Sequence, residues 1–269
     1  MSTPPSSGRR WSALADRAGL SLVESGDPNG PTLVLLPTLG TDHTLWEAIL
    51  PHLPQSLRIL RPDLPGHGIS TNLTPPGRIG AYITTVEHTL DARNLRNIAL
   101  LGHGLGGLIA QGLATKRLDL VRSLILSGTA ARIGTRDRWL ATARDAREAP
   151  GRLAAMLAQR WSLPRAPAIQ RAHIEDMIGA QNPEGIARAA EAMAGTDFYT
   201  TTAALRLPAL ALVGDRDAAT PSDLVSETAA LIPGSQISLL RNAGHLAMID
   251  APGAYATALR GFLKNTGHL

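Results

Sequence analysis

The chain has 269 residues, of which 44% are hydrophobic and 18% are charged, so it is long enough and apolar enough to bury a core of its own. It contains no cysteine, which excludes disulfides, thiolate metal sites and thiol nucleophiles. The net charge of +4 comes mostly from scattered arginines rather than from a basic run, so we expect no nucleic-acid partner.

Targeting and membrane segments are not expected either. Residues Met1–Arg10 are rich in Pro and Ser and lack the apolar stretch of a signal peptide. No apolar run reaches the length of about eighteen residues that a membrane-spanning helix needs. The sequence therefore predicts a soluble, cytoplasmic protein.

Short apolar runs bounded by Gly, Pro and Asp alternate with stretches of helical length along the chain. Runs that are apolar throughout, rather than alternating, predict parallel strands covered on both faces. The expected strands, in chain order, are Thr32–Leu36, Leu57–Leu60, Ile98–Leu101, Ser123–Leu126, Ala209–Val213 and Gln236–Leu240.

Helices are expected between these strands, among them Leu105–Thr115 and Asp223–Leu231, the latter with Ser222 as its N-cap. The alternation of strand and helix predicts an α/β fold, with a mostly parallel central sheet and helices on both faces.

One segment interrupts this alternation. Residues 130–203 carry an Ala-, Arg- and Met-rich helical pattern, interrupted by prolines at 150, 164, 167 and 183. A helical insertion of this size predicts a cap over the carboxyl edge of the sheet. The expected organisation is therefore a core of residues 1–129 and 204–269 with a helical cap of residues 130–203.

The turn after the third expected strand carries the sequence Gly102-His103-Gly104-Leu105-Gly106-Gly107. Its strand–turn–helix context and flanking glycines match the nucleophile elbow, G-x-S-x-G, with Gly104 where the serine should stand. A phosphate-binding loop is the alternative reading of such glycines. The acid and histidine loops later in the chain disfavour it.

An acid and a histidine follow the last two expected strands. The loop Gly214-Asp215-Arg216-Asp217 comes after the fifth strand, and Asn242-Ala243-Gly244-His245 comes after the sixth. The order of nucleophile position, acid and histidine is that of α/β-hydrolases, in which the acid orients the imidazole and the histidine moves protons. We prefer Asp217 to Asp215 because it lies deeper in its loop.

Two backbone N–H groups are expected to form an oxyanion hole. In this kind of fold one comes from the loop after the first expected strand and the other from the residue after the nucleophile. Leu39 and Leu105 hold these positions. Hydroxyls at Thr38, Ser70 and Ser127 belong to other loops, so none is expected to replace the missing serine.

Four motifs together resemble the 3-oxoadipate enol-lactonase family of the α/β-hydrolase superfamily. They are LLPTLGTDHTLW from Leu35, the D-x-x-G-H-G-x-S turn from Asp63, TAARIG from Thr129, and AGHL from Ala243. The resemblance covers nearly the whole chain and departs from the family at Gly104. It implies hydrolysis of a small anionic lactone in aromatic-ring catabolism, with no cofactor.

Candidate substrate-binding residues lie in the cap. Carried over by position from the resemblance, Arg132 could pair with a substrate carboxylate, which arginine binds with two hydrogen bonds, or could be an ordinary surface residue. Trp139 and Trp161 could wall the pocket or belong to the core of the cap. No spacing of Asp, Glu and His indicates a metal site.

Without a hydroxyl, Gly104 cannot form an acyl-enzyme. Three readings remain open. The serine was removed deliberately from a working hydrolase; or His245 and Asp217 act as a general-base dyad, in hydrolysis by water or in a non-hydrolytic isomerase, cyclase or C–C lyase reaction; or the protein has lost catalysis and binds a ligand. For hydrolysis by water, the missing CH2OH group should leave room for about one water beside His245.

Overall fold

The computed structural model describes residues 19–269, so the expectations about Met1–Arg10 lie outside the described residues. A seven-stranded sheet has the order β1-β3-β2-β4-β5-β6-β7. Only β1 runs antiparallel to its neighbour. The strands are β1 Leu22–Gly26, β2 Thr32–Leu36, β3 Arg58–Pro62, β4 Ile98–His103, β5 Val121–Ser127, β6 Ala209–Gly214 and β7 Gln236–Leu240.

All six expected strands form, and those at 32–36 and 236–240 have the expected bounds. Strand β1 was not expected, because its sequence LVESG carries too few apolar residues to stand out. The expectation that every strand is covered on both faces is wrong for β7. This strand lies at the edge of the sheet, and its Ile237 and Leu239 are 48% and 54% exposed.

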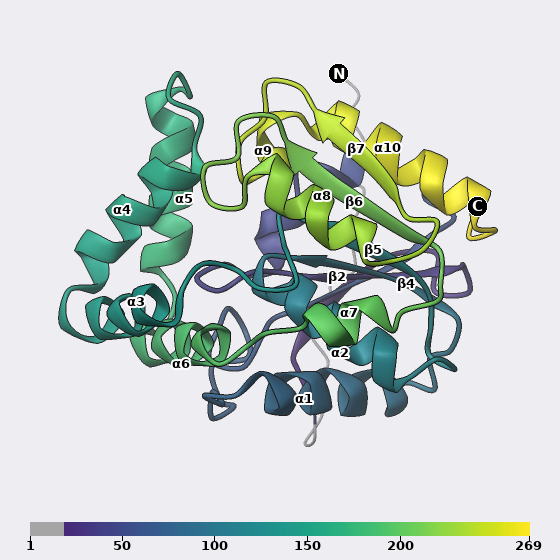
Figure 1. Ribbon diagram of the computed structural model, residues 1–269, viewed down its shortest axis with the longest axis horizontal. Helices are drawn as coiled ribbons and strands as arrows, with labels where there is room; N and C mark the ends of the chain where they lie inside the picture. Colours follow the sequence, from purple (N-terminus) through teal and green to yellow (C-terminus); the bar gives the residue numbers. More distant parts are fainter. Residues whose placement is uncertain (1–18) are drawn as a thin grey trace, which may run out of the picture.

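Helices cover both faces of the sheet, which confirms the predicted α/β class. Figure 1 shows α1 and α2 below the sheet, and α9 and α10 on the other side. The helices that follow the core strands are η1 His43–Trp46, η2 Leu50–His52, α1 Ile79–Asp91, α2 Leu105–Lys116, α8 Ser222–Ala230, α9 Ala247–Asp250 and α10 Pro252–Asn265. Helix α8 takes Pro221 as its N-cap, so the prediction of Ser222 as the cap is wrong.

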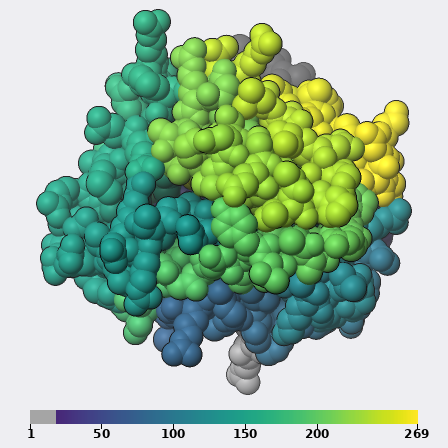
Figure 2. Space-filling view, viewed as in Figure 1, coloured from purple at the N-terminus to yellow at the C-terminus, as the bar shows by residue number. Residues whose placement is uncertain are grey.

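Five helices lie between β5 and β6, namely α3 Arg136–Glu148, α4 Pro150–Trp161, α5 Ala168–Gly179, α6 Pro183–Ala194 and α7 Tyr199–Ala203. Helices α3 to α6 form a separate lobe beside the sheet, whereas α7 lies against α2 (Figure 1). Pro150 and Pro183 stand in the first turns of α4 and α6, where a missing backbone N–H breaks no helical hydrogen bond. In the space-filling view a narrow hollow separates this lobe from the C-terminal segments (Figure 2).

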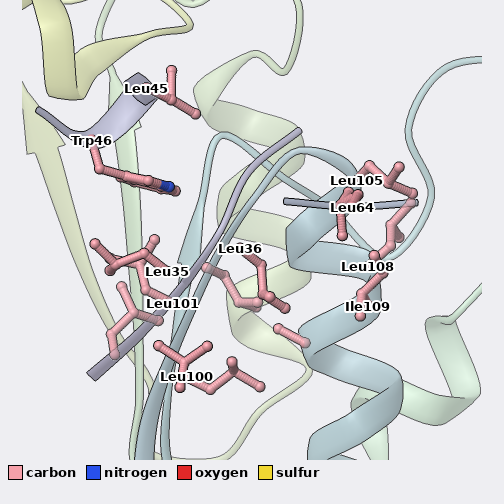
Figure 3. Close-up of a cluster of buried hydrophobic side chains, with 14 of the residues drawn as sticks. Leu35, Leu36, Leu45, Trp46, Leu64, Leu100, Leu101, Leu105, Leu108 and Ile109 are labelled. Carbon is pink, nitrogen blue, oxygen red and sulfur yellow. The ribbon is translucent and has the colours of Figure 1, made fainter. Parts of the chain in front are cut away.

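The core fixes the junction between β4 and α2, which the candidate site uses. Leucines of β2 and β4 meet apolar side chains of α2 in a cluster of fully buried residues (Figure 3). The side chain of Leu105, at the start of α2, lies near Leu64 within this cluster, so it points into the core. The first turn of α2 is therefore anchored by packing.

Candidate active site

Gly104 forms a sharp bend between β4 and α2. Its backbone has φ of 52° and ψ of −115°, a conformation that side-chain-bearing residues adopt only at a cost of about 1–3 kcal/mol. Its N–H donates to the carbonyl of Ser127 at 3.1 Å, and its carbonyl accepts from Oγ1 of Thr129 at 2.8 Å. The bend is thus held by the end of β5 and by the loop that follows it, and glycine relieves its strain.

The flanking glycines allow the helix to approach the strand closely. A Cβ on Gly102 would collide with the backbone of Gly106, and a Cβ on Gly106 would collide with the carbonyl oxygen of Leu36. Backbone atoms cannot yield as side chains can. The small residues around position 104 are therefore required by this junction.

The side chain of Thr38 lies beside Gly104. A Cβ built on Gly104 would stand 2.9 Å from Cβ of Thr38 and closer still to its Oγ1. The same Oγ1 accepts a hydrogen bond from the N–H of Leu105 at 3.2 Å. Thr38 lies on another loop, as expected, but this loop after β2 brings its side chain against Gly104, so the expectation that no hydroxyl lies near the missing serine is wrong. The position of a Cβ at residue 104 is taken by Thr38, and room for water remains in the cavity that Gly104 and His245 line.

His245 and Asp217 meet at the carboxyl edge of the sheet, in the loops after β7 and β6. Nδ1 of His245 lies 2.9 Å from Oδ2 of Asp217. Oδ2 also accepts from the Thr220 hydroxyl at 2.8 Å, and Oδ1 accepts from the N–H groups of Ala219 and Thr220 at 2.7 and 2.8 Å. An ionised carboxylate accepts from Nδ1–H, which leaves Nε2 of His245 free to take a proton.

The environment keeps Asp217 ionised. Burial raises the pKa of its carboxyl, but the charge and hydrogen bond of His245, with the hydrogen bonds of Thr220, outweigh this and bring the pKa to about 2. Asp215, the alternative acid, is exposed and accepts from the N–H of Ala243 at 3.2 Å. It therefore fastens one loop to the other, and the geometry favours Asp217 as the partner of His245.

Two aromatic side chains contact the imidazole of His245. The His103 ring lies with its centroid 4.6 Å away, and the Trp161 ring lies 5.5 Å away. Burial, followed by repulsion from His245, puts the pKa of His103 well below its usual value, so this neighbour stays neutral. His245 is thus held by packing as well as by Asp217.

A cavity of about 50 Å³ joins these elements, which is room for a few waters. Its floor comes from the core and includes Thr38, Leu39, Gly104 and His245. Its walls come largely from the cap and include Ile133, Arg138, Trp139, Met156, Leu157, Arg160, Trp161 and Met193. Gly104 and His245 therefore face one shared space.

The cap residues singled out from the sequence divide into two groups. Trp139 and Trp161 line the cavity. The structure does not bring Arg132 to it: this side chain is 58% exposed and lies 3.5 Å from a carboxylate oxygen of Asp197.

The cavity instead has two arginines that sequence reasoning missed. Arg160 donates to the carbonyl of Ala218 at 2.9 Å. The residue Arg138 is exposed at the mouth of the cavity, its guanidinium forms no hydrogen bond or ion pair with residues 19–269, and partial burial lowers its pKa. Its neighbour Trp139 was the only signal in the sequence that could have pointed to it.

The two expected oxyanion donors differ in whether their N–H groups already have a hydrogen-bond acceptor. Within the described part of the chain, no oxygen accepts the N–H of Leu39. The N–H of Leu105 is already taken by the hydroxyl of Thr38. Leu39 lines the cavity with its N–H unpaired among the described residues, and the N–H of Leu105 is covered by a hydroxyl group.

Among residues 19–269, no group of three or more His, Asp or Glu side chains is arranged to hold a metal ion. No helix in this range is long and apolar enough to cross a membrane.

Comparisons with known proteins agree with this architecture. Over 260 residues the chain is 27% identical to 3-oxoadipate enol-lactonase 2 of Acinetobacter baylyi, covering 93% of this chain and 95% of that protein. It is 29% identical to 3-oxoadipate enol-lactonase 1 of the same organism, covering 94% and 96%. The crystal structure of the enol-lactonase from Burkholderia xenovorans superposes with a TM-score of 0.86 at 29% identity, covering 95% of this chain and 100% of that one.

The family model described as the alpha/beta hydrolase family matches residues 33–258. This range contains the sheet from β2 onward, the cap, and the loops that carry Gly104, Asp217 and His245. The chain belongs to the alpha/beta hydrolase family.

Proposed function

We propose that this protein hydrolyses a lactone or ester without a covalent intermediate, with Gly104 at the nucleophile position of its family. His245, oriented by Asp217, acts as the general base on a water molecule. The observation that carries the proposal is the 2.9 Å contact between these two side chains, next to a cavity that both His245 and Gly104 line.

The geometry supports each part of such a reaction. Nε2 of His245 is the ring nitrogen not used by Asp217, so it can accept a proton from water. The cavity has room for that water. The N–H of Leu39 has no partner among residues 19–269, so it can donate to the oxygen that becomes negative as water adds.

The cavity walls favour an anionic substrate. Arg138 brings a guanidinium without a partner among the described residues, and Arg160 lies on the same wall. Arginine binds carboxylates through paired, charge-assisted hydrogen bonds. The relatives named above act on the enol-lactone of 3-oxoadipate, which carries one carboxylate. We therefore propose a small anionic lactone as the substrate class, with Arg138 rather than Arg132 facing its carboxylate.

Without a nucleophile, the expected kcat is far lower than that of a serine hydrolase. In a serine protease, removing the nucleophile lowers kcat by about 10⁶-fold, and about 10³–10⁴-fold catalysis over water remains. An enol-lactone releases a stabilised enolate, which makes it easier to hydrolyse than an alkyl ester. A dyad that activates water is therefore best matched to a substrate of this kind.

The enol-lactone of 3-oxoadipate is the substrate with which to test the proposal. Replacing His245 by Ala or Gln should lower kcat by about 10²-fold or more, because general-base catalysis contributes about 10²–10⁴-fold. His88, on α1 and outside the cavity lining, provides the matched control, and His88→Ala should keep the parent rate. Equal rates for the parent and both His245 variants would contradict the proposal.

A non-hydrolytic reaction on the same dyad is the second candidate. The covered N–H of Leu105 favours it, because the addition of water to a carbonyl is then short of one of the two backbone donors of its oxyanion hole, whereas His245 can still remove a proton next to a carbonyl. In D2O, such an enzyme would exchange a proton next to the substrate carbonyl, as detected by NMR, without opening the ring. Binding without exchange or ring opening would instead identify a ligand-binding protein.

A further inference from the structure

The hydroxyl of Thr38 is buried at the point where the family's chemistry takes place. Thr38 lines the cavity together with Gly104 and His245 and is 1% exposed. Its oxygen accepts the N–H of Leu105 at 3.2 Å. No acceptor among residues 19–269 takes its own hydrogen. A buried O–H donor is therefore left for a ligand.

We propose that the hydroxyl of Thr38 replaces the N–H of Leu105 as the second donor of the oxyanion hole. The inference rests on the proposed hydrolysis by water and assigns a catalytic residue to it. Thr38 precedes Leu39, whose N–H is the first donor, so both donors of the hole come from the loop after β2.

The contact with Leu105 strengthens this donor. A hydroxyl that accepts a hydrogen bond becomes a better donor, because hydrogen bonds in a chain polarise one another. Leu105 begins α2, so its N–H also carries the positive end of the helix dipole. The threonine O–H rotates freely about its C–O bond and can follow the developing charge. The N–H of Leu105 then acts through Thr38 instead of directly.

The proposed hydrolysis adds one water molecule across the ring C–O bond of the lactone. A water molecule gives a proton to Nε2 of His245 and forms a bond to the lactone carbonyl carbon, whose oxygen takes the electron pair of the C=O bond. That oxyanion accepts hydrogen bonds from Thr38 Oγ1 and from the N–H of Leu39. When the tetrahedral intermediate collapses, the ring C–O bond breaks and the enolate oxygen leaves. His245 returns its proton to the leaving group, and the ring-opened acid is released.

A nucleophilic role for Thr38 is the competing chemistry. Attack by its hydroxyl would need a base in contact with it, as in other activated nucleophiles. Thr38 Oγ1 forms no hydrogen bond with His245: Nδ1 of this ring is used by Asp217 and Thr220. Oγ1 forms its hydrogen bond with the N–H of Leu105, and in that bond it is the acceptor. The geometry therefore favours a donor over a nucleophile.

The test compares Thr38→Val, which keeps the shape and removes the hydroxyl, with Thr38→Ser, which keeps the hydroxyl. With the enol-lactone of 3-oxoadipate, Thr38→Val should lower kcat by about 10²–10³-fold and leave KM nearly unchanged, because an oxyanion donor acts in the transition state. Thr38→Ser should stay within about tenfold of the parent, since its hydroxyl can occupy the same place.

Thr41→Val is the matched control for a merely structural effect. The Thr41 hydroxyl is buried in the same loop and donates to the carbonyl of Thr38 at 2.9 Å, but it does not line the cavity. It should leave kcat within a few-fold of the parent. If Thr38→Val does not fold, as judged by thermal unfolding, Thr38→Ala takes its place against Thr38→Ser.

Three results overturn the inference: equal kcat for Thr38→Val and the parent, equal losses in Thr38→Val and Thr41→Val, or an acyl adduct on Thr38 by peptide mass analysis. The proposed hydrolysis by His245 and Asp217 is tested separately, by the His245→Ala variant. If His245→Ala keeps the parent rate, hydrolysis by the dyad is wrong. If His245→Ala loses activity while Thr38→Val keeps it, only the role of Thr38 is wrong.

Discussion

Thr38 and Gly104 are sterically matched: a Cβ on Gly104 would stand 2.9 Å from Cβ of Thr38. Carbon atoms that are not bonded pack at about 3.5–4.0 Å, so position 104 takes a side chain only if Thr38 moves. A hydrolase from which a serine had simply been removed would leave a space there. The filled space therefore favours a site in which the glycine and the threonine belong together.

Restoring the nucleophile should require two changes. We expect Gly104→Ser alone to raise kcat/KM on the enol-lactone by less than tenfold, because the new side chain meets Thr38. Gly104→Ser with Thr38→Gly frees both the space and the N–H of Leu105, and should gain at least 10²-fold through an acyl-enzyme.

Gly104→Ala is the control for the added side chain. It should lose about 1–3 kcal/mol of stability, as Gly104→Ser does, because any Cβ is strained at φ of 52°. It should gain no activity in either background. A large gain in the single Gly104→Ser variant would show that Thr38 does not obstruct the position.

Arg138 should determine preference for an anionic substrate. Replacing it by Met keeps the apolar stem and removes the guanidinium. This should lower kcat/KM by about 10- to 100-fold on the enol-lactone of 3-oxoadipate, since hydrogen bonds to charged groups contribute about 1.5–3 kcal/mol. The rate on α-angelica lactone, which has a methyl group in place of the carboxymethyl group, should not fall.

Arg132→Met is the matched control, because Arg132 is exposed and lies outside the cavity lining. Arg132→Met should leave kcat/KM unchanged on both lactones. Equal losses on the charged and the neutral lactone in Arg138→Met would mean that this arginine supports the cap rather than the substrate carboxylate.

Asp217 should make the free energy of unfolding depend on pH in the acid range. Its pKa falls from 3.8 to about 2 in the folded state, so its ionised form stabilises the fold above pH about 4, and this contribution is lost as the pH falls towards 2. The difference corresponds to about 2 kcal/mol.

Asp217→Asn, which cannot ionise, should lack that part of the pH dependence. Urea unfolding of the parent and of Asp217→Asn at several values between pH 5 and 2 measures it. The two stability curves should converge as the pH falls. Parallel curves over this range would contradict the assignment of a low pKa to Asp217.

The sequence predicts the sheet well because most of its strands are buried and continuously apolar. It misses β1 because Leu22–Gly26 contains polar residues, and it misjudges β7 because burial at the sheet edge depends on what packs beside it. The order of the loops places Gly104, Asp217 and His245 at one edge, since parallel strands bring their carboxyl ends together.

The remaining parts of the site depend on contacts between loops, which spacing along the chain does not encode. Thr38 meets Gly104 only because the loop after β2 folds over the start of α2. In the same way, Arg132 and Arg138 are equally plausible from sequence. The turn before α3 directs Arg132 towards Asp197, whereas Arg138, on the helix itself, lines the cavity.

We propose that hydrolysis proceeds here without a covalent bond between protein and substrate. Intact-mass measurement of the parent protein, quenched in acid during steady-state turnover of the enol-lactone of 3-oxoadipate, distinguishes this route from an acyl-enzyme. Ring-opened product should accumulate while the protein keeps its unmodified mass at every time point. A protein species heavier by one acyl group, formed and consumed at the rate of turnover, would contradict it.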